Sequence, residues 1–351
     1  MQIKKTLAIL ALAGIAIPTS VLASTADAAK TPQPCTSTVE FEELDTYDQV
    51  QCATTTDFVV FDDNITMALP EPGEWVQGFF DALEPLDSVE VAVFQSADGE
   101  IAAVLNGEAN GTPQALSALS ESDVASDIVE MIGNENHPQP VVPVPATTAV
   151  DGSPANKCSD SAQYVAAASR LIGDVNYYYN TAGQPSNFTS ANHRARIEAA
   201  ADAWELFDNS CNLDVGLPNL YTYYIGQTSQ SPGMNATSCI TQPSVNTFGW
   251  GAWGTASGVL GATCRWSNTR FAIAFNSSFT WYSGISETAC SGSAWDLGAV
   301  AVHEWGHALG LGHYNSYNQV MNSAARGHCA TFDRRIGRGD LRGIRELYGM
   351  L

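Results

Sequence analysis

The spacing of hydrophobic and polar positions divides the chain into strand-like and helix-like segments. Residues 55–69 and 88–105 contain β-branched and aromatic runs broken by turn residues, a pattern typical of strands. Residues 117–133 have the apolar spacing of an amphipathic helix. These segments predict a small α+β unit over about residues 35–136.

The second half of the chain alternates helical and strand-like patterns. We predict helices over residues 161–179 and 194–207, and strands at 220–225 and 270–275 within a stretch rich in Gly, Ser, Thr, Tyr and Trp. The aromatic residues of that stretch are interpreted as sheet and core packing. A further helix is expected from the N-cap residue Asp296 to Gly310. Residues 158–351 are long enough to form one well-buried domain.

Two other segments complete the predicted organisation. Lys4 and Lys5 precede an apolar run over residues 7–17 and then small residues, which predicts a signal peptide over residues 1–29. That run is too short to span a bilayer, so we expect a secreted product without a membrane anchor. Residues 137–157 contain five prolines and predict an extended linker. The predicted parts are therefore 1–29, an acidic part 30–136, the linker 137–157 and a C-terminal domain 158–351.

Charge separates the same two parts. Residues 31–156 contain 23 Asp and Glu and no Lys or Arg, whereas residues 157–351 contain 13 acids and 12 bases. Basic patches that would bind nucleic acid are absent from the first part, which excludes DNA or RNA as an expected partner. Six of the twelve bases form an arginine cluster: Arg326, Arg334, Arg335, Arg338, Arg342 and Arg345. We consider two interpretations equally: the acidic part docks on this cluster as a pro-region, or it is a solvated surface that keeps the protein soluble.

The candidate chemistry lies in HEWGHALGLGH, residues 303–313. His303 and His307 are four residues apart and project from one face of a helix, where two imidazoles can bind one Zn²⁺. Gly310 can end the helix with a positive φ, so that His313 returns to the same ion. Three protein ligands leave a fourth position for water, as in catalytic zinc sites. Glu304 is placed to act as general base toward that water.

These residues resemble the metzincin zinc proteases, whose pattern is HExxHxxGxxH followed by a methionine turn, and most closely the matrixins. Met321, eight residues after His313, is the candidate turn methionine. Residues 194–207, 271–284, 294–304 and 339–349 are similar to matrixin segments in the same order. The resemblance implies an α+β catalytic domain with a twisted mixed sheet, long helices and an active-site helix that ends at a glycine.

The chain also departs from the matrixin pattern. Tyr314 follows the third histidine where serine is usual. Outside the motif, residues 158–351 have only His193 and His328, so a second, structural zinc site is not expected. The latency peptide PRCGxPD is missing, and Cys35 is a poor match to it. Latency could use an acidic side chain on the zinc, but none of the 23 acids stands out. Calcium remains open, since no residue pattern specifies a site for it.

The eight cysteines fit an exported protein. Cys35 and Cys52 lie in the acidic part and six lie in the C-terminal part, which favours disulfides within each part over free thiols. Six cysteines allow 15 pairings, and we favour sequential pairing. A Cys290–Cys329 disulfide would then join the ends of the segment that holds the candidate metal ligands.

The sequence thus predicts a secreted zinc metalloendopeptidase that cuts protein or peptide substrates. His303, His307 and His313 would bind a single zinc ion, and Glu304 would be the base. One alternative is a noncatalytic zinc-binding adhesin that retains the fold, although such a protein is expected to lose the glutamate. In a second alternative, the chain is an enzyme that acts on a narrow target, and the acidic part recruits substrates and does not inhibit the enzyme.

Overall fold

A computed structural model describes residues 49–50, 58–60, 65–71, 74–82, 89–95, 101–107, 164–166, 170–206, 219–314, 319–323 and 325–349. The predicted signal peptide, the linker 137–157, the helix predicted at 117–133, and Cys35, Cys52, Cys158 and Cys211 lie outside these residues. The division into parts at the linker therefore stays a prediction. Within the described residues, no helix is both long enough and apolar enough to cross a bilayer.

The N-terminal part of the described structure contains six strands. They are β1 (Gln49–Val50), β2 (Phe58–Val60), β3 (Thr66–Ala68), β4 (Trp75–Ala82), β5 (Val89–Gln95) and β6 (Ile101–Gly107). The strands predicted within 55–69 and 88–105 are confirmed as β2, β3, β5 and β6. Strand β4 was not predicted, although its sequence WVQGFFDA is rich in large apolar residues.

The C-terminal part alternates strands and helices. Its strands are β7 (Val165–Ala166), β8 (Val175–Tyr179), β9 (Thr222–Gln227), β10 (Met234–Asn235), β11 (Ser238–Cys239), β12 (Asn246–Gly251), β13 (Val259–Ser267), β14 (Arg270–Asn276), β15 (Trp281–Tyr282), β16 (Trp295–Asp296) and β17 (Leu311–Gly312). Its α-helices are α3 (Ser190–Glu205), α4 (Leu297–Leu309) and α5 (Arg338–Tyr348), with short 3₁₀ turns at Thr255–Ser257, Glu287–Ala289 and Thr331–Arg334.

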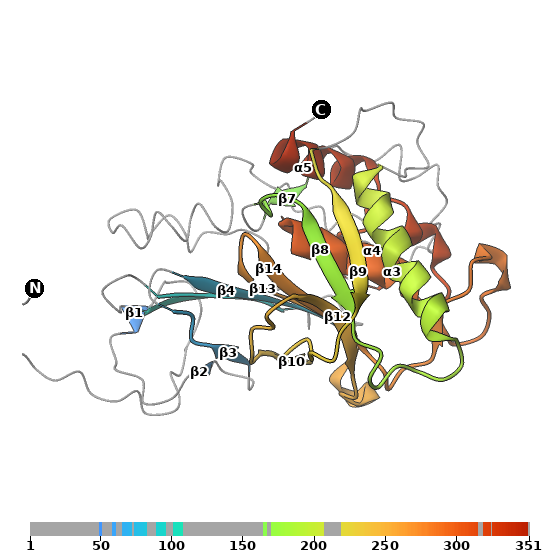
Figure 1. Cartoon of the computed structure of the whole chain (residues 1–351), viewed down its shortest axis with the longest axis horizontal. Coiled ribbons are helices and arrows are strands. Elements are labelled where there is room, and N and C mark those ends of the chain that lie inside the picture. Colours follow the sequence, from blue (N-terminus) through green and yellow to red (C-terminus); the bar gives the residue numbers. More distant parts are fainter. Residues whose placement is uncertain are drawn as a thin grey trace, which may run out of the picture.

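One nine-stranded mixed sheet runs through both parts in the order β1-β6-β5-β4-β13-β14-β12-β8-β9. Strands β14, β12, β8 and β9 are parallel to one another, whereas β13 is antiparallel to both β14 and β4. Strand β4 of the acidic part continues the sheet beside β13, so the described strands of the two parts share one sheet (Figure 1). A mixed sheet with three described helices fits the α+β class expected for a metzincin domain.

Two hydrophobic cores lie on opposite faces of this sheet. Helices α3 and α4 pack on one face, where Trp204 and Trp305 are fully buried against β8, β12 and β14. Figure 1 shows these two helices together beside the strands of the C-terminal part. The second core joins β3, β4 and β5 to β13, with Phe80 and Val91 packed near Cys264. The N-terminal strands thus share a core with the C-terminal part.

The helix predicted over residues 161–179 is wrong. The described residues of this stretch contain β7 and β8, and β8 alternates buried and exposed side chains as a strand does. Gly173 has a φ of 77°, which is not a helical conformation, so no helix continues through it toward β8. The alanine-rich run suggested a helix, but Val175 and three tyrosines pair with β12 and β9, which are distant in sequence.

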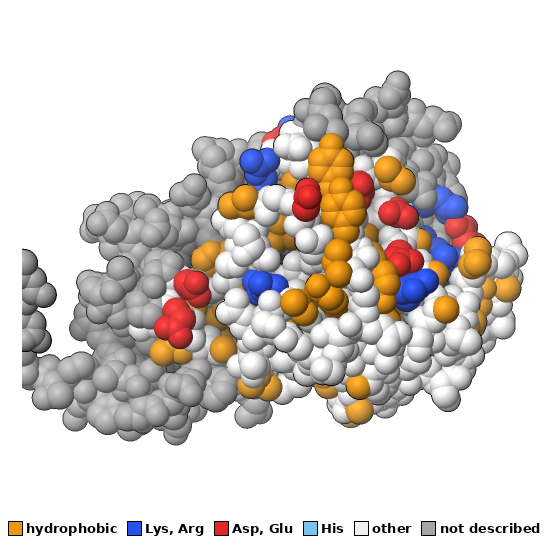
Figure 2. All heavy atoms as spheres, viewed as in Figure 1, with side chains coloured by type: hydrophobic (Ala, Val, Ile, Leu, Met, Phe, Trp, Pro, Cys, Tyr) orange, Lys and Arg blue, Asp and Glu red, His pale blue; other side chains and the backbone are white. Residues whose placement is uncertain are grey.

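The other predicted elements of the C-terminal part are confirmed. The helix predicted at 194–207 is α3, which begins earlier because Thr189 and Asn192 form a capping box. The strands at 220–225 and 270–275 are β9 and β14. Edge strand β9 exposes Tyr223 and Ile225, and Figure 2 shows a stripe of hydrophobic side chains over it.

Two disulfides lie in the described residues. Cys290–Cys329 has the predicted pairing, and Cys239–Cys264 is the neighbouring pair of the sequential scheme. The Cys290–Cys329 disulfide closes a loop that contains all of α4, and the Cys239–Cys264 disulfide joins β11 to β13. The C-terminal part is therefore covalently cross-linked on both sides of the candidate site.

Candidate metal centre

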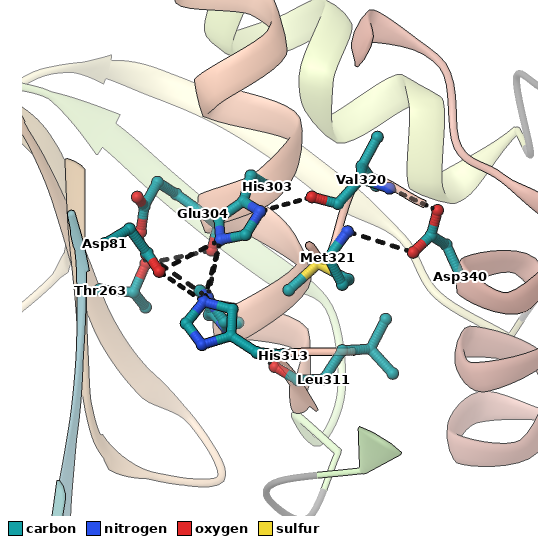
Figure 3. Close-up of polar contacts among 10 residues, drawn as sticks. Asp81, Thr263, His303, Glu304, Leu311, His313, Val320, Met321 and Asp340 are labelled. Atoms are coloured by element: carbon teal, nitrogen blue, oxygen red, sulfur yellow. Dashed lines mark hydrogen bonds and ion pairs between the residues drawn. The ribbon is translucent and has the colours of Figure 1, made fainter. Parts of the chain in front are cut away.

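Helix α4 and the turn after it bring the three predicted histidines together (Figure 3). The Asp296 side chain caps the start of α4 by accepting a hydrogen bond from the Ala299 N–H at 2.8 Å. Gly310 ends the helix with a φ of 108°, which a residue with a Cβ rarely adopts.

The turn at Gly310 places His313 opposite the helix. The Nε2 atoms of His303 and His307 are 3.0 Å apart, those of His307 and His313 3.0 Å, and those of His303 and His313 3.3 Å.

Backbone carbonyls fix the orientation of two of the rings. His303 Nδ1 lies 2.5 Å from the Val320 carbonyl oxygen, and His307 Nδ1 lies 2.8 Å from the Leu311 carbonyl oxygen. A carbonyl only accepts, so each Nδ1 carries the proton and each Nε2 presents a lone pair toward the other ring. Burial lowers the pKa of His307 to about 4, which keeps this imidazole in the neutral form that binds metals.

This donor set fits zinc. Two lone pairs facing each other at 3.0 Å repel unless a cation lies between them. Zinc–nitrogen bonds of about 2.0–2.1 Å in a tetrahedron separate neighbouring donors by roughly 3.3–3.4 Å, close to the spacing found here. In the described part of the chain, the cluster of Asp81 with these three histidines is the one group found that could hold a metal ion.

Asp81 is the unexpected member of this group. Its Oδ1 lies 2.5 Å from His313 Nε2 and 3.3 Å from His303 Nε2, and its Oδ2 lies 3.4 Å from His307 Nε2. Burial alone would raise the pKa of Asp81, but the three histidines hold it well below its ordinary value. The sequence analysis expected an open fourth position for water. In this structure a carboxylate from β4 lies there.

Glu304 lies beside the three histidines and is fully buried. The Thr263 hydroxyl of β13 donates a hydrogen bond to its Oε2 at 2.6 Å, while its Oε1 has no hydrogen-bond partner among the described residues. Burial raises the pKa of Glu304, and the nearby Asp81 charge raises it further. Gly261 lies so close that a Cβ there would be 2.3 Å from Oε1, so β13 fits tightly against this carboxylate.

The segment after His313 packs against α4 and helps to orient His303. Met321 is buried, and its Sδ would be 2.2 Å from a Cβ added at Gly306, so the small residue in α4 makes room for it. Asp340 of α5 is 1% exposed and accepts hydrogen bonds from the Val320 N–H at 2.9 Å and the Met321 N–H at 3.3 Å. The carboxylate of α5 therefore holds the turn whose Val320 carbonyl orients His303.

A pocket opens next to the histidines. It holds about 550 Å³ of empty space, counting space that is open to solvent, and its lining includes His303, Glu304, Trp295, Val300 and Arg326. The lining is mostly apolar with a few charged groups, as in sites that receive a side chain of a ligand.

The predicted docking of acidic residues on the arginine cluster is not supported. Arg326 pairs with Asp333, Arg334 with Asp296, Arg335 with Glu287 and Arg342 with Glu346. Every one of these acids belongs to the C-terminal part. The described contacts of the acidic part with the C-terminal part lie instead at β11, β13 and the histidines.

The two other histidines of residues 158–351 have packing roles. His193 is fully buried, with Nδ1 2.7 Å from the Ser283 hydroxyl and Nε2 3.1 Å from the Pro185 carbonyl oxygen. The ring of His328 packs on Trp295.

Comparison with known proteins links this region to a family. Residues 252–349, which include α4, the turn and α5, match the matrixin model of the peptidase family M10. The C-terminal region is matrixin-like. The chain is 41% identical over 76 residues to human matrix metalloproteinase-25 and 40% over 78 residues to its mouse counterpart. It is 43% identical over 58 residues to metalloendoproteinase 1 of Glycine max.

These similarities are short. They cover 21%, 21% and 16% of this chain, and 13%, 12% and 18% of the human, mouse and soybean proteins. The chain thus spans less than a fifth of the length of the relatives it matches.

Three residues near the centre were missed by the sequence analysis. Asp81 was one of 23 acids with no distinguishing motif, although it lies next to the last residue of a mostly apolar strand, which is an unusual place for a carboxylate. Thr263 and Asp340 had no local signal, because each acts on a residue more than 18 positions away.

Proposed function

We propose that this chain is a secreted zinc-dependent endopeptidase that hydrolyses peptide bonds in protein substrates. His303, His307 and His313 bind one zinc ion and Glu304 is the general base. The observation that carries the proposal is the set of three Nε2 atoms 3.0–3.3 Å apart with a buried carboxylate beside them, in a matrixin-like region. Secretion rests on the predicted signal peptide, residues 1–29.

The chain's own residues suit this reaction. A zinc ion bound there supplies a coordinated water with a pKa near 7 and polarises the carbonyl of the scissile bond. Glu304 has one oxygen held by Thr263 and the other without a partner, so the second oxygen is available to take a proton from water. The buried position of Glu304 beside the histidines allows it to hold that proton and then release it to the leaving amine.

The pocket beside His303 and Glu304 suggests how a substrate is held. An apolar side chain next to the scissile bond can enter it between Trp295 and Val300. Such a contact would place the carbonyl carbon near the histidines. Proteins and peptides are the proposed substrates on the strength of the matrixin resemblance.

The alternative, a noncatalytic zinc-binding protein, takes support from Asp81. Four protein ligands around a zinc ion are typical of structural sites. Glu304 argues against this alternative, because a buried carboxylate with an unpartnered oxygen is costly to keep without a use. The two proposals differ in whether the site becomes active once the acidic part is detached.

A casein assay on the cleaved chain tests the proposal. Residues 31–156 contain no Lys or Arg, so trypsin can cut at Lys157 and leave the acidic part intact; trypsin is then inhibited. Wild type should hydrolyse casein, and Glu304→Gln should lose activity by about 10²–10⁴-fold, the usual contribution of a general base. Chelation should abolish activity as well.

The matched control is Glu198→Gln, which changes a glutamate on the outer part of α3 and should keep full activity. Zinc content should be equal in wild type and Glu304→Gln. Zinc-loaded wild type that still cuts nothing after cleavage at Lys157 and release of the acidic part supports the noncatalytic alternative. Activity that survives in Glu304→Gln removes Glu304 as the base.

A further inference from the structure

Strand β4 lies where a peptide would have to bind to reach the histidines. It pairs antiparallel with β13 from Val259↔Ala82 to Arg265↔Gln77. The same strand β13 carries Thr263, which holds Glu304, and places Gly261 directly opposite Asp81. The described edge of the C-terminal strands beside the metal centre is therefore already occupied by a segment of this chain.

Two side chains of β4 point at the metal centre. Residues two apart on a strand share a face, so Phe79 and Asp81 project together. The Phe79 ring stacks on the His307 ring with centroids 4.1 Å apart and 13° between the planes, and Phe79 is fully buried. Asp81 contacts all three histidines within 3.4 Å (Figure 3).

The opposite face of β4 anchors the strand. Val76 and Phe80 pack with Val91 of β5 and with Cys264 of β13 in the second core. Gly78 lies against the Cys239–Cys264 disulfide, where an added Cβ would be 2.9 Å from the Cys239 sulfur. The position of Asp81 is thus set by a packed sheet and not by a single ionic contact.

We propose that Asp81 is the fourth zinc ligand of a latent form and that β4 is an internal inhibitor lying along the peptide-binding edge. The term latent rests on the proposed peptidase function. The assignment of Asp81 as a zinc ligand depends only on the geometry of the four side chains. The carboxylate takes the position that the reaction gives to water, and β4 takes the hydrogen-bonding edge of β13. Activation then requires that β4 leave β13.

Zinc affinity of the intact chain tests the ligand assignment without relying on activity. All variants carry Glu304→Gln so that the chain cannot cut itself, and zinc is titrated against a competing chelator. Asp81→Asn keeps the shape of the side chain but removes its charge, and Asp81→Ala removes the ligand altogether. Each should weaken zinc binding by at least about tenfold, since even partners that only support a ligand contribute 10–100-fold. Glu74→Gln, an exposed acid just before β4, is the matched control and should bind zinc as the parent does.

A second arm measures access to the metal. In the intact cobalt-loaded parent, acetohydroxamate should leave the visible spectrum unchanged, whereas in Asp81→Ala it should shift the spectrum. Far-ultraviolet circular dichroism checks folding, and Asp81→Asn serves for the affinity test if Asp81→Ala does not fold. Unchanged zinc affinity in a folded Asp81 variant, or hydroxamate binding to the parent as strong as to Asp81→Ala, overturns the inference.

The activity arm separates the two proposals. With Glu304 restored, the uncleaved Asp81→Asn chain should stay inactive toward casein, because β4 still covers the edge of β13. Wild type whose acidic part has been cleaved at Lys157 and released should hydrolyse casein. If zinc affinity falls as predicted but no form of the chain cuts casein, the ligand assignment stands and the peptidase function fails. If cleaved wild type is active but the affinity is unchanged, the peptidase stands and Asp81 is not a ligand.

Discussion

Replacing Asp340 with alanine should destabilise the metal centre, although α5, the helix that carries Asp340, does not touch that centre. The Asp340 carboxylate accepts three backbone hydrogen bonds, from Val320 at 2.9 Å, Met321 at 3.3 Å and Gly337 at 2.7 Å. Hydrogen bonds to a charged group contribute about 1.5–3 kcal/mol each, so three at the lower end give about 4–5 kcal/mol. At roughly 2–4 °C per kcal/mol, the Tm should fall by about 8–20 °C.

The same change should loosen zinc. Val320 supplies the carbonyl that orients His303, so Asp340→Ala should weaken zinc affinity by about 10–100-fold. Differential scanning calorimetry and chelator competition measure the two effects on the zinc-loaded chain. Glu198→Ala, which breaks a partly exposed pair with Arg194, is the control and should cost no more than about 0.5 kcal/mol. A Tm for Asp340→Ala within 2 °C of that control, roughly 1 kcal/mol or less, would refute the reasoning.

Three further predictions concern the support of the site. Gly306→Ala places a Cβ 2.2 Å from the Met321 sulfur and should cost about 1–3 kcal/mol in thermal unfolding; an unchanged Tm contradicts the packing described. Burial lowers the pKa of His193 below 6.5, so His193 binds a proton more readily in the unfolded chain than in the folded one. The free energy of unfolding should therefore fall as the pH drops below about 6.5. The Tm difference between pH 7.5 and pH 5.5 should therefore shrink in His193→Gln, and an equal difference argues against it. Replacing Cys290 and Cys329 with serine opens a loop of 39 residues and should cost about 4 kcal/mol and speed zinc loss to a chelator; zinc loss at the parental rate counts against the cross-link's role.

Helix α4 could be predicted because its signals are local. Asp296 caps its start, Gly310 ends it, and the histidines repeat at the helical interval, so the sequence itself contains the geometry. The Cys290–Cys329 disulfide agrees with the sequential pairing that was favoured among the 15 possible pairings. The structure brings the three predicted histidines together, while their roles and that of Glu304 stay proposals.

The parts that could not be predicted depend on contacts between distant segments. Strand β8 lies in a stretch with an alanine-rich run, and only its pairing with β9 and β12 makes it a strand. Asp81 meets His313 across 232 positions of sequence, and the charge count offered 23 equivalent acids. The net charge suggested attraction to the arginine cluster, but four of its six arginines, Arg326, Arg334, Arg335 and Arg342, have acidic partners within their own part.

The most direct test of the account is the zinc content of the purified, folded chain and of its His307→Ala variant. We predict one zinc ion per chain in the parent and less than about a tenth of that in the variant, because two neutral ligands and a carboxylate remain where four donors were. A folded parent without zinc, or a variant that keeps a full equivalent, would contradict the proposed centre.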